Sequence, residues 1–369
     1  MLWYVIICVL MFYPFLLVYI GKRNGINVQK FALKISCVTL LFFMAMRSIS
    51  IGVDTKFYSY AFKQLSAAAW KDVASMQVYA EAGARWTLKL EIGYRFYNKL
   101  VGCFCDSPQA IVIVNSCIIF FLLYRLIYKR SSNYMLSIWL YLTLGIFQTE
   151  MNVTRNAIAI LLCYLAFQYI EKKQFWKYSL LICIAATFHK SVLVFIPLYF
   201  LLGRKICSAK RMLCIVAGSV ICGIACIRFG DYIQAYFTMG TGRYLTAGNE
   251  KSESLLVGGF YITIIIFIRF MMKKEERRNM FSNSSLGSWI FMLNLCCFGV
   301  NIGLKMAARA AALFGAYMII FVPELINQIP DKKRRRWVIF LIAAGCDLQY
   351  VLRMMINNIG GTMPYRFFW

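Results

Sequence analysis

The chain has 369 residues, of which 61% are hydrophobic and 15% are charged, and its mean hydropathy is +0.65. Because a soluble domain is about 45–50% apolar and about 25% charged, this composition excludes an ordinary soluble protein and indicates an integral membrane protein. The formal charge of +26 would suggest nucleic-acid binding in a soluble chain, but here it first reflects topology. The chain has a single histidine and no Cys-x-x-Cys pair, which argues against a zinc site.

Long apolar runs predict about twelve membrane-spanning helices, since one span requires about 20 apolar residues. We therefore expect an all-α, polytopic membrane protein with a single membrane domain over residues 1–369. The predicted spans cover residues 2–20, 29–46, 107–128, 134–150, 154–170, 177–188, 190–203, 211–229, 255–272, 286–304, 308–328 and 336–352.

The orientation follows from Lys and Arg, which favour the cytoplasmic side in short loops. Basic clusters occur in alternate connections, at residues 22–30, 125–130, 172–177, 204–211, 273–278 and 332–336. This alternation places both termini outside the cytoplasm. It also makes residues 47–106, after the second span, a large extracytoplasmic loop, and residues 230–254 a second one.

Four ionisable side chains fall near the outer ends of predicted spans: Arg47, Arg155, His189 and Arg309. Charge in hydrocarbon costs about 3 kcal/mol on insertion scales, so such groups are candidates for function. Lys305 lies four residues before Arg309, and the two cations on one helix face favour an anion such as a lipid phosphate. The simpler explanation for any single cation at a span end is that it extends to the headgroups.

His189 is a candidate general acid or base, because imidazole titrates near neutral pH and the chain has no second histidine for a metal site. A lone histidine is also often a hydrogen-bonded packing residue. The other candidate bases are Asp54 and Glu91 in the external loop and Asp347 in the last span.

The external loop 47–106 is too aromatic for a disordered linker. Its Trp and Tyr side chains can anchor in the headgroup region or stack on the apolar faces of sugars. Residues 56–70 also fit an amphipathic helix on the membrane surface, which is an equally good explanation. In the second loop, the glycine-rich stretch GTGRYLTAGNE is a candidate substrate lid.

A series of short segments in a particular order carries a family resemblance. They are Arg47 with GVDTKFY, LEIGYRFYNKL, TRNAIAILLCYLAF followed by a basic turn, FHKSVLVFIPLYF, an Arg at the start of a late span, and the terminal PYRFFW. In this order, and through most of the chain, the sequence resembles the EpsG-type family of bacterial polysaccharide polymerases. That family is related in role to the Wzy polymerases of O-antigen and capsule.

The resemblance implies a metal-independent glycosyltransferase of the bacterial cytoplasmic (inner) membrane, with no cofactor and an active site facing the periplasm or exterior. Its substrate would be an oligosaccharide repeat unit linked to undecaprenyl diphosphate. The growing glycan leaves its lipid diphosphate and joins the next lipid-linked unit. Membrane lipids and a chain-length regulator are further candidate partners, and nucleic acid is not expected.

Within this resemblance, candidate roles follow for the polar residues. Cations near the outer boundary could stabilise the departing diphosphate, a large effect in such catalysis. The candidate diphosphate ligands are Arg155 and Arg309, with support from Arg47 and Lys305. His189 or Asp54 would be the catalytic base. The candidate glycan contacts are Tyr58, Glu91, Tyr94, Arg243 and Tyr244.

Three other activities compete with polymerisation. A polysaccharide ligase, which moves finished glycan onto another lipid, shares this chemistry and differs only in its acceptor. A flippase for lipid-linked oligosaccharide binds the same diphosphate, but it is expected to hold its charges in a central cavity. A membrane O-acyltransferase would call for further basic or histidine chemistry on the cytoplasmic side.

Overall fold

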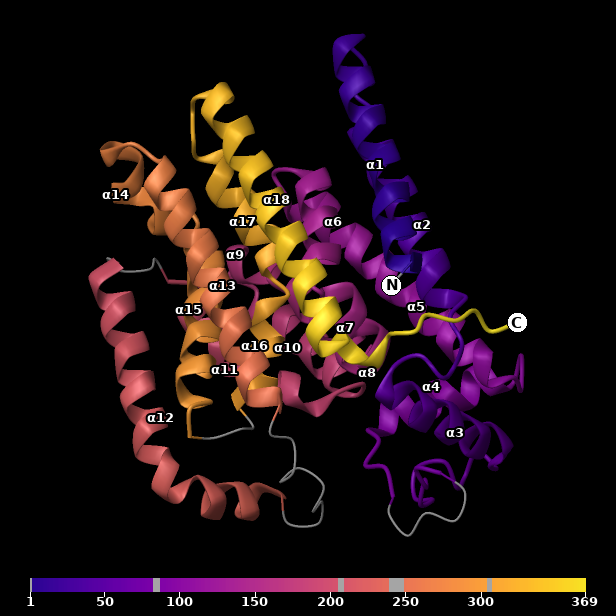
Figure 1. The fold of residues 1–369 in the computed structure, drawn as a ribbon. Coiled ribbons are helices and arrows are strands. Elements are labelled where there is room, and N and C mark those ends of the chain that lie inside the picture. The colour runs from indigo at the N-terminus through magenta and orange to yellow at the C-terminus, as the bar shows by residue number, and fades with distance from the viewer. Residues whose placement is uncertain (1, 82–86, 205–208, 239–248, 304–306) are drawn as a thin grey trace. The chain divides into compact units, whose positions relative to one another are not determined.

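The computed structural model describes residues 2–81, 87–204, 209–238, 249–303 and 307–369 (Figure 1). In these ranges every regular element is a helix, which confirms the all-α prediction. The chain divides into two compact units, Met1–Pro197 with Gly345–Trp369, and Leu198–Ala344. We describe each unit by itself.

The first unit is built around α5, which packs against α2 and α8, while α8 also packs against α10. Two further helices, α3 and α4, pack on each other and on α5 (Figure 1). The elements of this unit are α1 (Leu2–Arg23), α2 (Gln29–Ala45), α3 (Val53–Ala67), α4 (Ile92–Gly102), α5 (Pro108–Arg130), α6 (Tyr134–Thr143), α7 (Ile146–Asn152), α8 (Thr154–Ala166), α9 (Gln168–Glu171), α10 (Phe175–Ala186), η1 (Lys190–Val194), the start of α11 (Phe195–Leu202), the end of α18 (Lys332–Asn357) and η3 (Ile359–Gly361).

The second unit contains α15 at its centre, packed against α12 and α16. Glycine permits this close approach: a Cβ on Gly223 would lie 2.1 Å from the Gly299 carbonyl oxygen, and one on Gly299 would lie 2.4 Å from Ser219 Oγ. Besides parts of α11 and α18, its helices are α12 (Ala209–Thr238), α13 (Asn249–Met271), α14 (Lys274–Asn283), α15 (Ser285–Val300), α16 (Ala307–Gly315) and α17 (Met318–Asn327).

By length and composition, two helices of the described ranges can cross a membrane: Pro108–Arg130, and Lys332–Ile356 of α18. The pair Arg309–Gly315 and Met318–Asn327, bent by 42°, would form a third. Other predicted spans fall on shorter apolar helices, and the span expected over 134–150 is divided into α6 and α7 at Gly145, whose φ is 78°. The total of twelve spans therefore stays a prediction.

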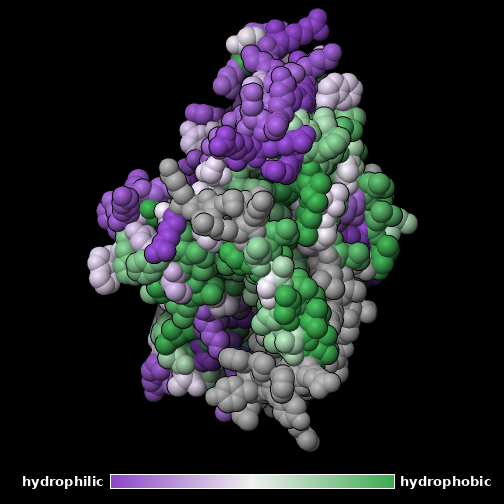
Figure 2. Space-filling model, turned by 90° about the vertical axis from the view of Figure 1, so that its left-hand side faces the viewer, coloured by the Kyte–Doolittle hydropathy of each residue, from purple (hydrophilic) through white to green (hydrophobic). Residues whose placement is uncertain are grey.

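The molecular surface carries large apolar areas. Figure 2 shows hydrophobic side chains gathered across the middle of one face, with hydrophilic ones above them. Exposed apolar side chains occur along the helices of the second unit, including Leu213, Ile221 and Ile224 of α12 and Leu256 and Phe270 of α13. Such extensive exposure is typical of helices that contact lipid, as expected for a membrane protein.

The described residues of the segment 47–106, predicted to be an external loop, include two helices that pack on each other, α3 and α4. The amphipathic segment expected over 56–70 forms α3, and its apolar side buries Ala61 and Leu65 in one cluster with Val73, Val78 and Tyr94. A serine begins the next long helix: Ser107 Oγ accepts a hydrogen bond from the Gln109 N–H, and Pro108 occupies the first helical turn.

The C-terminal segment is tied to the end of α2. The Ser48 N–H donates to the Arg366 carbonyl at 2.9 Å, and the Phe368 N–H donates to the Met46 carbonyl at 3.1 Å. The buried Tyr365 hydroxyl adds a 2.6 Å bond to the Phe43 carbonyl. In Figure 1 this segment is the yellow trace that ends at the label C. The terminal PYRFFW thus forms a strap, residues 364–369, across the residues that follow α2.

We expect Tyr365→Phe to lower the free energy of unfolding by about 1 kcal/mol, because it removes one buried hydrogen bond and leaves a carbonyl without that donor. Denaturant or thermal unfolding in detergent measures the change. The matched control is Tyr19→Phe, whose side chain is 68% exposed in α1 and should unfold like the wild type. Equal loss in both variants would contradict the role of the strap.

Candidate functional site

Arg155, the second residue of α8, is held by an acidic residue that precedes α4. Its Nη1 forms an ion pair with Oε2 of Glu91, which lies at the N-terminal cap of α4. The two side chains are 13% and 12% exposed. Because this charge pair is shielded from water, its attraction is stronger than that of a surface pair. A small part of each side chain stays exposed.

Two tyrosines cover the guanidinium. The Arg155 Cζ lies 5.1 Å from the ring centre of Tyr58 and 5.4 Å from that of Tyr94, within range of cation–π attraction. Both rings are buried, so their faces contact the arginine rather than solvent in this structure. Burial raises the pKa of Tyr58 and Tyr94, with partial opposition from the Arg155 charge, so both stay neutral at physiological pH.

The second carboxylate oxygen of Glu91 faces the connection between α10 and η1. Glu91 Oε1 accepts a 3.1 Å hydrogen bond from the Lys190 N–H and lies 3.5 Å from His189 Nδ1. The His189 side chain is 29% exposed, so it is reachable from outside. One carboxylate therefore joins the arginine to the histidine. We call Glu91, Arg155, His189, Tyr58 and Tyr94 the Glu91 cluster.

Two of the segments that carry the family resemblance meet at this cluster. The Tyr94 N–H donates to the Thr187 carbonyl at 3.0 Å, which ties LEIGYRFYNKL to the residues before FHKS. The contact is close at Gly93, where a Cβ would lie 2.4 Å from Thr187 Cβ. Glycine at this position lets α4 approach the turn after α10 and brings Glu91 to His189.

The environment of Glu91 favours its charged form. Burial raises the pKa of Glu91, but the His189 imidazole, the Arg155 charge and the Lys190 N–H together lower it below the usual value of 4.5. The carboxylate is therefore ionised at neutral pH and available to both basic partners.

Uncharged polar residues position the helix ends around the cluster. The Tyr97 hydroxyl donates to Asn115 Oδ1 at 2.9 Å, and Asn115 Nδ2 donates to Thr154 Oγ1 at 3.2 Å, next to Arg155. Sequence reasoning missed Asn115 and Thr154. An asparagine within an otherwise apolar span was the available signal, since a buried amide requires partners.

Asp54 and Arg47 lie on the same side of the first unit as the start of α8. Asp54 is in the first turn of α3, and its N–H donates to Asn152 Oδ1 at 2.7 Å. Arg47 is fully buried, and its guanidinium donates to the Met44 carbonyl and, at 2.8 Å, to the Met151 carbonyl. These contacts give Arg47 a structural part in joining α2 to α7. Its expected contact with diphosphate stays a prediction.

No described contact links the other expected site residues to the Glu91 cluster. Arg309 lies in the first turn of α16, in the second unit, and its side chain is exposed. Lys305, Arg243 and Tyr244 lie outside the described residues. Among the residues that the structure describes, no group of three or more His, Cys, Asp and Glu is placed to hold a metal ion.

We expect Glu91→Gln to lower the melting temperature at pH 7, because the substitution removes a shielded ion pair. Folding lowers the pKa of Glu91 below 4.5, so the stability that its charge contributes is complete above that value and is lost as the pH falls through the folded-state pKa. The difference between wild type and variant should be constant above about pH 5.5 and shrink below about pH 4.5.

Melting curves in detergent, recorded between about pH 3.5 and about pH 7.5, test this expectation. The control is Glu171→Gln, since Glu171 is paired with Arg130 but is 60% exposed, and such pairs contribute little. A Glu91→Gln difference that does not change with pH would contradict the assigned ion pair.

Comparison with known proteins identifies the family of this chain. No curated protein and no solved structure matches the chain significantly. Residues 30–367 match the model of the EpsG family, which confirms the predicted resemblance and includes every member of the Glu91 cluster. The match covers most of the chain, and the protein therefore belongs to the EpsG family.

Proposed function

We propose that this protein polymerises oligosaccharide repeat units linked to undecaprenyl diphosphate, at the outer face of the bacterial cytoplasmic membrane. Membership of the EpsG family suggests a polymerase-like role in polysaccharide biosynthesis. The observation that carries the proposal is the Glu91 cluster, which joins a candidate base to a shielded guanidinium where a predicted span meets the external loop.

The proposed reaction transfers glycan between two lipid-linked substrates. A hydroxyl oxygen at the non-reducing end of the acceptor forms a bond to the anomeric carbon of the donor glycan. The bond from that carbon to the lipid diphosphate breaks, and the diphosphate leaves with the electron pair. The hydroxyl proton passes to a base. The protein must therefore supply a proton acceptor, stabilise the departing charge and align two bulky substrates.

His189 is the proposed base, and Glu91 is its positioning residue. The carboxylate lies 3.5 Å from Nδ1, which leaves Nε2 as the nitrogen that can accept the hydroxyl proton. A carboxylate on the far side of an imidazole orients the ring and stabilises the imidazolium that forms, as in the Ser-His-Asp arrangement. This geometry favours His189 over Asp54, the other candidate base.

Arg155 is the proposed ligand of the departing diphosphate. A guanidinium is permanently charged and binds phosphate oxygens with paired donors. Glu91 and the two tyrosine rings hold Arg155 in place before substrate binds, so little reorganisation is required during the reaction. Because Glu91 already neutralises part of this charge, further cations are expected at the diphosphate. The exposed Lys190 beside His189 is one candidate, and Arg309 is another.

Deletion of the gene in the native bacterium tests the activity itself. If polymerisation is the lost step, a gel of the surface glycan should show single repeat units on the acceptor and no longer chains. Complete loss of surface glycan would instead indicate a ligase or flippase. A normal ladder of chain lengths with altered acetylation would indicate acyl transfer. Either of these results contradicts the proposal.

We expect Arg155→Ala and Arg309→Ala each to reduce long-chain glycan by at least about 100-fold, because each removes a charge that stabilises the departing diphosphate. Protein level and membrane insertion should stay normal. The matched control is Arg278→Ala, an exposed arginine on α14 in a predicted cytoplasmic connection, which should give the wild-type ladder. Unchanged chain length in both Arg155→Ala and Arg309→Ala would reject the assignment.

A further inference from the structure

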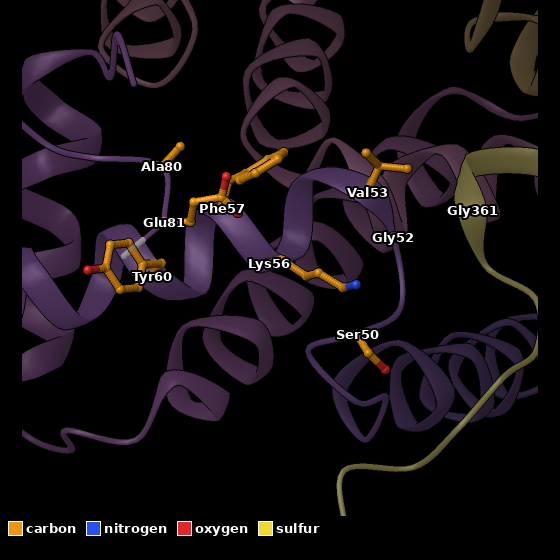
Figure 3. A pocket seen from close by; sticks show the side chains of 9 residues that line it. All are labelled: Ser50, Gly52, Val53, Lys56, Phe57, Tyr60, Ala80, Glu81 and Gly361. Carbon is orange, nitrogen blue, oxygen red and sulfur yellow. The ribbon is translucent and has the colours of Figure 1, made fainter. Parts of the chain in front are cut away.

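A cavity of about 520 Å³ lies beside α3, outside the Glu91 cluster (Figure 3). This volume falls within the range of about 300–1,000 Å³ that is usual for small-molecule sites. Its floor is one side of α3, where Val53, Lys56, Phe57 and Tyr60 occupy positions i, i+3, i+4 and i+7 of the helix. None of these four residues was among the sequence-based site predictions.

The two sides of α3 make different contacts. Tyr58 is buried and points to Arg155, whereas the neighbouring Phe57 is only partly buried and lines the cavity. A helix is about 10–12 Å across with its side chains, so the cavity and the cluster are separated by about one helix diameter. A substrate of several sugars is long enough to occupy both.

The cavity walls come from segments far apart in the sequence. On one side, the Gly52 N–H donates to the Gly361 carbonyl at 3.2 Å, and both glycines line the cavity. On the other side, Gln64 of α3 forms two hydrogen bonds with the backbone of Tyr79, at 2.8 and 3.0 Å, which places Glu81 at the opposite wall. Hydrogen bonds to the backbone therefore fix a residue in each of two walls of the cavity.

The lining combines ring faces with polar groups of both charges. Figure 3 shows Phe57 and Tyr60 projecting from α3, with Glu81 beside Phe57 and Lys56 extending toward the side of Ser50. An acyl chain would desolvate Lys56 and Glu81, which is costly. A diphosphate would meet only one cation and would be repelled by the carboxylate. A pyranose ring fits both features, because its C–H face packs on aromatic rings and its hydroxyls both donate and accept hydrogen bonds.

We propose that this cavity binds a sugar residue of the lipid-linked glycan and holds the oligosaccharide while its reacting end lies at the Glu91 cluster. This inference rests on the proposed polymerase function. Phe57 and Tyr60 provide the stacking surface, and Lys56, Ser50 and Glu81 bind hydroxyl groups. The sequence predicted glycan stacking at Tyr58 and Tyr94, which are buried. The proposal assigns this stacking to the cavity-lining rings of Phe57 and Tyr60 instead.

The test is direct binding by the purified full-length protein, in a detergent without a sugar headgroup. The probe is the repeat-unit oligosaccharide of the native bacterium, released by mild acid from its lipid diphosphate carrier and therefore free of lipid and phosphate. Isothermal titration or saturation-transfer NMR measures Kd. We expect Phe57→Ala and Tyr60→Ala to raise Kd by about tenfold each, equivalent to about 1.4 kcal/mol.

Two further variants make the result specific. Lys56→Ala truncates an exposed side chain, so it leaves the core intact and should still weaken binding. Phe104→Ala removes a ring that is 85% exposed and does not line the cavity, and it should bind like the wild type. Wild-type melting temperatures in all four variants would confirm that they fold.

The outcomes separate this inference from the proposed function. If the wild type fails to bind the oligosaccharide at millimolar concentration, or if Phe57→Ala, Tyr60→Ala and Lys56→Ala all bind it like the wild type, the sugar site is wrong. Arg155→Ala should bind the phosphate-free oligosaccharide normally although it no longer extends chains. A normal ladder after gene deletion would overturn the polymerase function whatever the binding data show.

Discussion

The site depends on one carboxylate with two partners. Glu91 places one oxygen on Arg155 and the other toward His189 and the Lys190 N–H. These partners come from α8 and from the turn after α10, so the contact joins the residue before α4 to two helix ends. A shielded guanidinium or carboxylate alone would be costly, whereas the pair is compensated. The same carboxylate that pairs with Arg155 lies 3.5 Å from Nδ1 of the candidate base, His189.

Two features of the proposed function meet on one helix, α3. One side of α3 sends Tyr58 onto Arg155, and the opposite side lines an open cavity. The Gly52–Gly361 hydrogen bond and the two hydrogen bonds between Gln64 and the Tyr79 backbone hold the cavity walls. A glycan bound on this helix is positioned by rigid elements, and positioning supplies much of the rate in a reaction between two large substrates.

Much of this architecture could be predicted from local signals. Apolar runs predicted helices, the amphipathic pattern predicted α3, and the position of ionisable residues at span ends selected Arg155 and His189. Two results depend on contacts between residues far apart in the sequence. Glu91 meets Arg155 across 64 positions, so its role as a bridge could not be distinguished from that of a base. The burial of Tyr58 and Tyr94 likewise depends on how α3 and α4 pack, which periodicity alone does not specify.

The most direct test of the Glu91 cluster is a double-mutant cycle on chain elongation, with purified protein and the native lipid-linked repeat unit as substrate. Elongation rates are compared for the wild type, Glu91→Gln, His189→Ala and the double variant. Because Glu91 also pairs with Arg155, part of its effect persists without His189. If Glu91 also acts through His189, the double variant should lose clearly less rate than the product of the two single losses, because residues that act as one unit are not additive. If the two losses multiply, Glu91 and His189 act independently and the account is contradicted.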